Sequence, residues 1–95
     1  MKTEELQQIL KNALADRETF TQLILSDMPA SGSHPACRKV SVRPPDSNTT
    51  DSFQVHYFTD KKHLTKHQPL ADVIALLALP FTRAHLQCAQ SDLHV

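Results

Sequence analysis

Residues 37–43 read Cys-Arg-Lys-Val-Ser-Val-Arg, and residues 53–58 read Phe-Gln-Val-His-Tyr-Phe. Over most of both stretches apolar residues alternate with polar or charged ones, which is typical of strands with one face in a core. Pro44 and Pro45 follow the first stretch and end it, because proline has no backbone N–H to donate to a neighbouring strand. The polar segment 46–51 is therefore expected to form the turn of an antiparallel hairpin.

The region before these strands, residues 1–27, is predicted to be helical. Its first half has apolar residues at spacings of three and four, as in a helix with one buried face: Leu6, Ile9, Leu10, Ala13 and Leu14. Thr3 is suited to cap this helix, and Asp16 to cap a continuation whose apolar residues lie within 20–25. A kinked helix or two short helices are therefore expected. The following segment, 28–36, holds two prolines and the only glycine, which indicates a loop.

Beyond the hairpin, the pattern predicts one more strand and one more helix. A polar third strand is expected over Lys61–Lys66, so that the strands together occupy 37–67. Pro69 suits the start of a helix, which is predicted over 68–79. Residues 83–95 alternate only in part, which allows a fourth strand there. The order predicts an α+β two-layer sandwich, in which an N-terminal helix or helix pair and a C-terminal helix cover a three-stranded antiparallel meander.

The composition of the 95-residue chain fits one globular domain. Its 40% hydrophobic residues are ordinary for a folded protein, and its ten basic and ten acidic residues cancel, so global charge favours no class of partner. Cys37 and Cys88 do not make a disulfide framework, and the acidic N-terminus lacks the features of an export signal. The longest apolar run, 73–79, is far shorter than the about 20 residues that a bilayer requires. We expect a cytoplasmic protein without a membrane partner.

The sequence contains no recognisable constellation of catalytic or cofactor-binding residues. Gly32 is the only glycine, so a glycine-rich phosphate-binding loop cannot form. Paired Cys-x-x-Cys motifs, which many zinc sites use, do not occur. His63 and His67 would share one face of a helix, but in a strand they lie about 13 Å apart. The sequence therefore predicts no catalytic, cofactor-binding or metal-ligating residue, and no enzymatic activity for this chain alone.

Positive charge is concentrated in residues 34–67, where six basic and three acidic residues give a net charge of +3. A strand face that mixes such charges with imidazole and aromatic rings is able to contact phosphates and to stack on a base, which favours RNA as a ligand. The candidate ligand-binding residues are Arg38, Lys39, Arg43, His56, Lys61, Lys62 and Lys66. The alternative is a solvated outer sheet face that binds nothing.

Several short motifs carry a family resemblance: Leu-Ser-Asp-Met-Pro at 25–29, Arg-Lys-Val-Ser-Val-Arg-Pro at 38–44, Phe-Gln-Val-His-Tyr-Phe at 53–58, and then Lys61, Lys62 and His67. With these motifs, residues 20–95 resemble the N-terminal accessory region of a family of bacterial class I S-adenosylmethionine-dependent methyltransferases of poorly defined substrate. The resemblance implies that this chain is an N-terminal fragment of a larger protein. It also implies a downstream catalytic domain as partner, which would bind S-adenosylmethionine through a glycine-rich loop that these 95 residues lack.

The resemblance gives the matching residues an accessory role, either in substrate binding or in packing on the catalytic domain. The predicted order of elements is also that of a double-stranded-RNA-binding domain, although His-Gln-Pro-Leu-Ala at 67–71 replaces the basic cluster of that domain's last helix. We therefore expect a non-catalytic accessory domain that binds a substrate, with RNA as a candidate. The alternative is a protein-interaction or homodimerisation domain in which Leu86, Cys88 and Leu93 pack on a partner.

Overall fold

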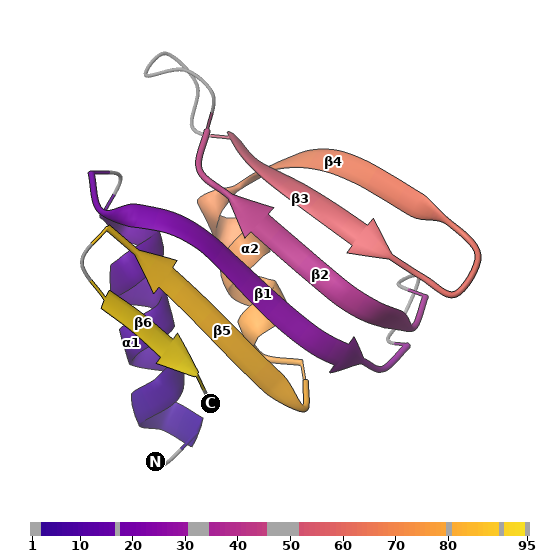
Figure 1. The fold of residues 1–95 in the computed structure, drawn as a ribbon, viewed down its shortest axis with the longest axis horizontal. Coiled ribbons are helices and arrows are strands. Elements are labelled where there is room, and N and C mark those ends of the chain that lie inside the picture. The colour runs from indigo at the N-terminus through magenta and orange to yellow at the C-terminus, as the bar shows by residue number, and fades with distance from the viewer. Residues whose placement is uncertain are drawn as a thin grey trace.

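The computed structural model describes residues 3–16, 18–30, 35–45, 52–79, 81–89 and 91–94. Figure 1 shows the two helices and six strands that these ranges contain. The helices are α1 (Thr3–Ala15) and α2 (Leu70–Leu77). The strands are β1 (Phe20–Met28), β2 (Cys37–Arg43), β3 (Ser52–Phe58), β4 (His63–Pro69), β5 (Arg83–Cys88) and β6 (Ser91–His94).

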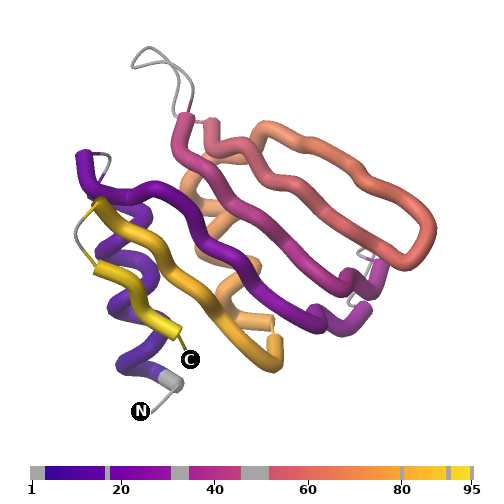
Figure 2. Tube along the Cα trace, in the orientation of Figure 1, coloured from indigo at the N-terminus to yellow at the C-terminus, as the bar shows by residue number. Residues whose placement is uncertain are grey.

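The six strands form one sheet in the order β4-β3-β2-β1-β5-β6, and every neighbouring pair is antiparallel. Strands β1 to β4 form a meander, and α2 then carries the chain from the β4 edge to β5, on the other side of β1. Both helices lie on the same side of the sheet (Figure 1 and Figure 2). We call that side the inner face and the opposite side, which no described element covers, the outer face.

The hydrophobic core lies between the inner face and the two helices. Leu10 and Leu14 of α1 are buried, because the helical spacing places them on the side toward the sheet. Val40 and Val42 of β2 and Val55 of β3 are fully buried, as the alternation of their strands predicts. Within the described residues, neither helix has the length and apolar character needed to cross a membrane.

The prediction that residues 20–26 continue the N-terminal helix is wrong, because they belong to β1, the strand between β2 and β5. Leu23 and Leu25 are fully buried on the inner face, and Ile24 between them lies partly exposed on the outer face. A register shift near the start of β1 interrupts the alternation. Because the outward-facing Ile24 is also apolar, the two-residue period of this strand is hidden in the sequence.

The chain passes from α1 into β1 through a turn centred on Asp16, not through a second helix. The Asp16 side chain accepts a hydrogen bond from the Glu18 backbone N–H at 3.3 Å. The Asp16 carbonyl accepts another from the Phe20 N–H at 2.9 Å, which directs the chain into the sheet. The predicted capping of α1 by the Thr3 side chain lies outside the described part of the structure.

The predicted fold class is wrong because the sheet is larger than the sequence indicates. The expected three-stranded meander is part of a six-stranded antiparallel sheet, and 51% of the described residues lie in strands. Residues 83–94 supply two of these strands, and β4 begins at His63 instead of Lys61. With six strands, the order is no longer that of a double-stranded-RNA-binding domain. The helix expected over 68–79 forms over the shorter range Leu70–Leu77 with Pro69 as its N-cap, whereas the hairpin turn expected at 46–51 lies outside the described residues.

Candidate ligand-binding face

Strand pairing places side chains from all six strands in register on the outer face. Residues that lie directly opposite each other in antiparallel strands point to the same face of a sheet. We call a series of such opposed residues, one from each successive strand, a row. The first row crosses the whole sheet and contains Thr65, His56, Ser41, Ile24, His85 and His94. A second row contains His63, Phe58, Lys39, Ser26 and Arg83. A third row, on the other side of the first, contains His67, Gln54 and Arg43.

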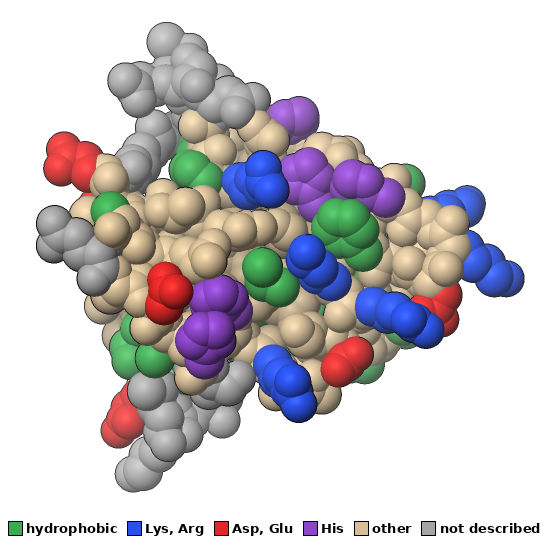
Figure 3. Space-filling model, viewed as in Figure 1, with side chains coloured by type: hydrophobic (Ala, Val, Ile, Leu, Met, Phe, Trp, Pro, Cys, Tyr) green, Lys and Arg blue, Asp and Glu red, His purple; other side chains and the backbone are tan. Residues whose placement is uncertain are grey.

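All five histidines that the structure describes belong to these rows, and His34 lies outside the described residues. Figure 3 views the outer face and shows histidine side chains in separate groups, with Lys and Arg side chains between them. The three rows contain the cations Lys39, Arg43 and Arg83, and the carboxylate of Asp92 lies on the same face beside His85. The outer face therefore gathers imidazole and positive charge from segments that are far apart in the sequence.

One of the histidine groups is an aromatic cluster made of His56, Phe58 and His63. The Phe58 and His63 rings stack with their centroids 4.2 Å apart and their planes at 10°. The Nδ1 atom of His56 lies 3.1 Å from Nε2 of His63 and 3.2 Å from Oγ1 of Thr65, so hydrogen bonds orient the imidazoles. The Lys39 ammonium lies 5.2 Å from the Phe58 ring centroid, within the range of a cation–π interaction. The cluster thus presents ordered rings beside a positive charge.

The surroundings of His56 lower its pKa below the usual value of about 6.5. Burial of the imidazole is the largest cause, because it penalises the charged form. The positive charges of His63, Arg43 and His67 lower the pKa further. At neutral pH the neutral form of His56 is therefore favoured, and the ring offers a stacking surface and hydrogen bonds.

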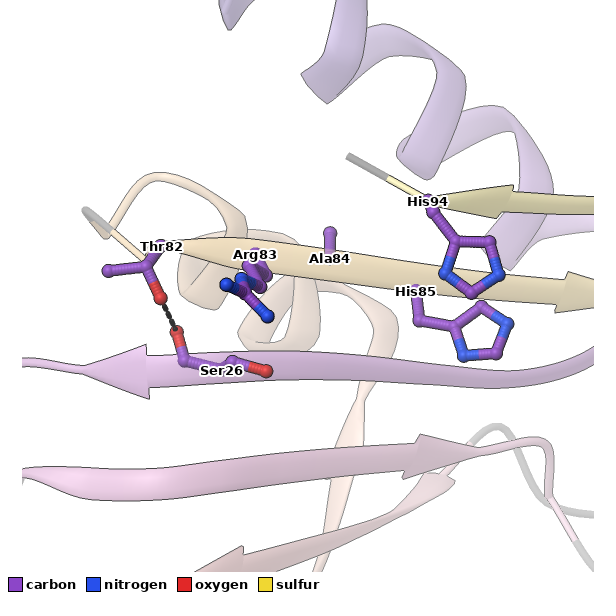
Figure 4. A pocket seen from close by; sticks show the side chains of 6 residues that line it. All are labelled: Ser26, Thr82, Arg83, Ala84, His85 and His94. Atoms are coloured by element: carbon purple, nitrogen blue, oxygen red, sulfur yellow. Dashed lines mark hydrogen bonds between the residues drawn. The ribbon is translucent and has the colours of Figure 1, made fainter.

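The other group is formed by His85 of β5 and His94 of β6. Their rings stack with centroids 3.8 Å apart and planes at 20°. Figure 4 shows the two rings side by side at one end of an open cavity of about 500 Å³. The cavity is lined by Ser26, Thr82, Arg83, Ala84, His85 and His94. Asp92 lies beside the pair, with its Oδ2 atom 3.7 Å from His85 Nε2.

The structure brings together only some of the seven predicted ligand-binding residues. Lys39, Arg43 and His56 share the outer face. Lys66 pairs with the buried Val55 and so belongs to the inner side of the edge strand β4, with its Nζ atom 5.7 Å from the Tyr57 ring centroid. Its positive charge therefore does not contribute to the outer face.

The other three predicted residues, Arg38, Lys61 and Lys62, lie at the end of the sheet beside the β3–β4 turn. Arg38 forms an exposed ion pair with Asp60. Lys61 and Lys62 belong to the turn, which the Thr59 N–H closes by donating to the Lys62 carbonyl at 2.9 Å. These three cations extend the positive charge beyond the rows without joining them.

Sequence reasoning missed the part of the outer face that β5 and β6 supply. Arg83, His85 and His94 reach this face because β5 pairs with β1, and no local pattern specifies that pairing. The only sequence signal for this part of the face was the alternation in the segment 83–88. Alternation shows which residues of a strand share a face, but it does not identify the strand that pairs with it.

No family model, curated protein or solved structure matches this chain. The methyltransferase resemblance therefore stays a proposal, and the geometry and charge of the outer face are the features that indicate a function.

The S-adenosylmethionine site that the resemblance implies does not fit the described residues. That site uses a glycine-rich loop between a strand and a helix, and the only glycine, Gly32, lies outside the described part of the chain. The direct connection from a strand to a helix is that from β4 to α2, which passes through Pro69. Since this junction is formed by proline, we assign no cofactor contact to it.

Proposed function

We propose that this chain is a non-catalytic binding domain that holds single-stranded RNA on its outer face. The observation that carries the proposal is the second row, in which the Lys39 ammonium lies over Phe58 and Phe58 stacks on His63. Open sheets bind single-stranded nucleic acids by stacking bases on aromatic side chains while cations contact the phosphates. The outer face has both features, and neither helix covers it.

The spacing of the cations supports an extended ligand. Lys39 and Arg43 are four residues apart on β2, which corresponds to about 13 Å along the strand. Arg83 lies in the same row as Lys39, two strands away, or about 10 Å across the sheet. The aromatic cluster lies on the other side of β2. A backbone that contacts these cations passes close enough to place bases on Phe58 and His63.

The proposal predicts binding that weakens with salt to a degree set by the number of cations. If three cations each neutralise one phosphate, log Kd rises with log salt with a slope of about 2 for a single strand. Affinity then falls roughly 20-fold between 50 and 200 mM salt. Fluorescence anisotropy with a labelled, unstructured 12-nucleotide RNA measures this slope directly.

Charge reversal tests which face binds the RNA. In the double variant Lys39→Glu with Arg43→Glu, repulsion replaces two of the three contacts, and we expect binding to be lost at 100 mM salt. The control is Lys11→Glu with Lys66→Glu, which changes the net charge equally at positions on α1 and on the inner side of β4. Equal affinity of the first variant and the unmodified chain contradicts the proposal.

Removal of the central ring tests the stacking contribution separately. Phe58→Ala is expected to weaken RNA binding by about 1–3 kcal/mol, which is the usual contribution of one base–aromatic contact. Because this substitution leaves every charge in place, the salt slope should not change. A reduced slope with unchanged affinity would show that Phe58 only positions Lys39.

The family resemblance leads us to propose further that the domain serves a cytoplasmic S-adenosylmethionine-dependent methyltransferase and presents the RNA to a catalytic domain of that enzyme. In that setting the outer face contributes to substrate affinity and takes no part in methyl transfer. The test is to extend the reading frame past Val95 and to assay the longer product. Lys39→Glu with Arg43→Glu should raise KM for RNA and leave kcat unchanged.

A second candidate function is protein association through the β4 edge. This strand has no neighbour on one side within the described sheet, and its Leu64 is 43% exposed. An open cavity of about 380 Å³, lined in part by Leu64, Pro35 and Ala36, adjoins it. By contrast, Leu86, which the sequence assigned to such an interface, is buried in the chain's own core. Sedimentation velocity of the unmodified chain and of Leu64→Lys distinguishes a β4-mediated dimer from a monomer.

A further inference from the structure

The β5–β6 hairpin brings three potential metal ligands to one place on the outer face. His85 and His94 lie directly opposite each other in the two strands. Asp92 precedes His94 by two residues on β6 and therefore lies on the same side of the sheet. One ligand atom from each of the three side chains lies within 4.8 Å of the other two.

These three side chains do not satisfy one another by hydrogen bonding. The Nε2 atom of His85 is buried and has no hydrogen-bond partner among the described residues. Asp92 Oδ2 lies 3.7 Å from it, which is beyond hydrogen-bonding distance. Burying a polar atom without a hydrogen-bond partner destabilises the folded protein. The unpartnered Nε2 atom therefore indicates a ligand that either accepts the lone pair of this nitrogen or forms a hydrogen bond with it.

We propose that His85, Asp92 and His94 bind one divalent transition-metal ion of the Zn²⁺ type. Two imidazole nitrogens and one carboxylate oxygen suit Zn²⁺, Co²⁺ and Ni²⁺, whereas Mg²⁺ and Ca²⁺ prefer oxygen ligands alone. Bonds to zinc of about 2.0–2.2 Å require the ligand atoms to approach to roughly 4 Å or less. Asp92 and His94 are exposed, so rotation of their side chains closes the remaining gap.

The surroundings leave room for a further ligand on the metal. The cavity shown in Figure 4 extends from the two histidines past Arg83 to Ser26 and Thr82. Three protein ligands leave a tetrahedral ion with one open position, which water or an anionic group fills. The Arg83 guanidinium, which lines the same cavity, favours an anion in that position.

Isothermal titration of the full chain with ZnCl₂ at pH 7.5 tests the proposal. We expect one ion per chain, and His85→Gln and His94→Gln should each weaken binding by about tenfold or more. Titration with MgCl₂ should give no heat of binding. The Co²⁺-loaded chain should show the visible absorption of a site with nitrogen ligands, and His94→Gln should abolish it.

The matched control is His67→Gln, which removes an imidazole from the outer face at a distance from the hairpin. This variant should bind Zn²⁺ as tightly as the unmodified chain. If binding persists in His85→Gln with His94→Gln but is lost in His56→Gln with His63→Gln, the metal site belongs to the aromatic cluster and the proposal is wrong. Circular dichroism of each variant verifies that loss of binding is not loss of fold.

Discussion

Two neighbouring residues of β1 should lose very different amounts of stability on the same substitution, because one faces the core and the other faces outward. Leu25 is fully buried between Val40 and Ala84, its partners on the adjacent strands. Ile24 lies on the outer face and is partly exposed. A helix over the same residues would instead group Ile24 with Phe20 on one apolar stripe. Replacing each residue by threonine, which keeps a high strand propensity, isolates the effect of burial.

The expected loss in the free energy of unfolding follows, for each substitution, from the environment of the side chain. Leu25→Thr leaves a cavity and buries a hydroxyl among apolar side chains, which we expect to cost about 3 kcal/mol or more. Ile24→Thr places the hydroxyl at the solvent-facing surface and should cost below about 1 kcal/mol. For a domain of this size, the first change corresponds to a fall in Tm of roughly 12 °C or more.

Urea unfolding followed by circular dichroism at 25 °C measures both free energies of unfolding. If Leu25→Thr fails to fold, Leu25→Val provides a milder substitution, with an expected cost of about 1 kcal/mol. Equal losses for Ile24→Thr and Leu25→Thr would refute the assignment of β1 as a strand with a buried and an exposed face.

Two further predictions concern titration and thiol reactivity. Because the folded state lowers the pKa of His56, the unfolded state binds more protons in acid, so the free energy of unfolding should fall as pH drops below about 6.5. Urea unfolding from pH 8 to pH 5.5 checks this, and His56→Gln should flatten the dependence; an unchanged slope would contradict it. Cys37 is 3% exposed and burial raises the pKa of its thiol, so it should react with a thiol reagent more slowly than the half-buried Cys88. Rates for Cys37→Ser and Cys88→Ser assign the two phases, and a faster Cys37 would contradict the burial.

Local sequence pattern was sufficient to predict a helix or strand where one face of the element is apolar and the other is polar. Val40 and Val42 alternate with polar or charged residues, and β2 forms where that alternation predicts. The same holds for β3 and for the helix that follows Pro69. It failed at β1, since Leu23, Ile24 and Leu25 are apolar in succession and fit a helix as well as a strand.

The candidate site was predictable only within one hairpin. Lys39, Arg43 and His56 belong to β2 and β3, which are neighbours in both sequence and space. The contributions of Arg83 and His85 depend on the pairing of β5 with β1, across an intervening helix and more than fifty residues. Sequence pattern assigns a face to each residue, whereas this long-range pairing decides which faces become one surface.

The corrected position of β1 also determines how the two proposals can be tested independently. Ser41 and Ile24 separate His56 from His85 in the first row, a distance of three strand spacings or about 14 Å. The Gln22 amide donates to the Ser41 hydroxyl at 2.8 Å and ties β1 to β2 at this point. Removing the His94 imidazole therefore leaves the stack of Phe58 on His63 untouched, and removing Phe58 leaves the hairpin ligands in place. Loss of metal binding with RNA binding retained, or the reverse, identifies which half of the outer face has the proposed role.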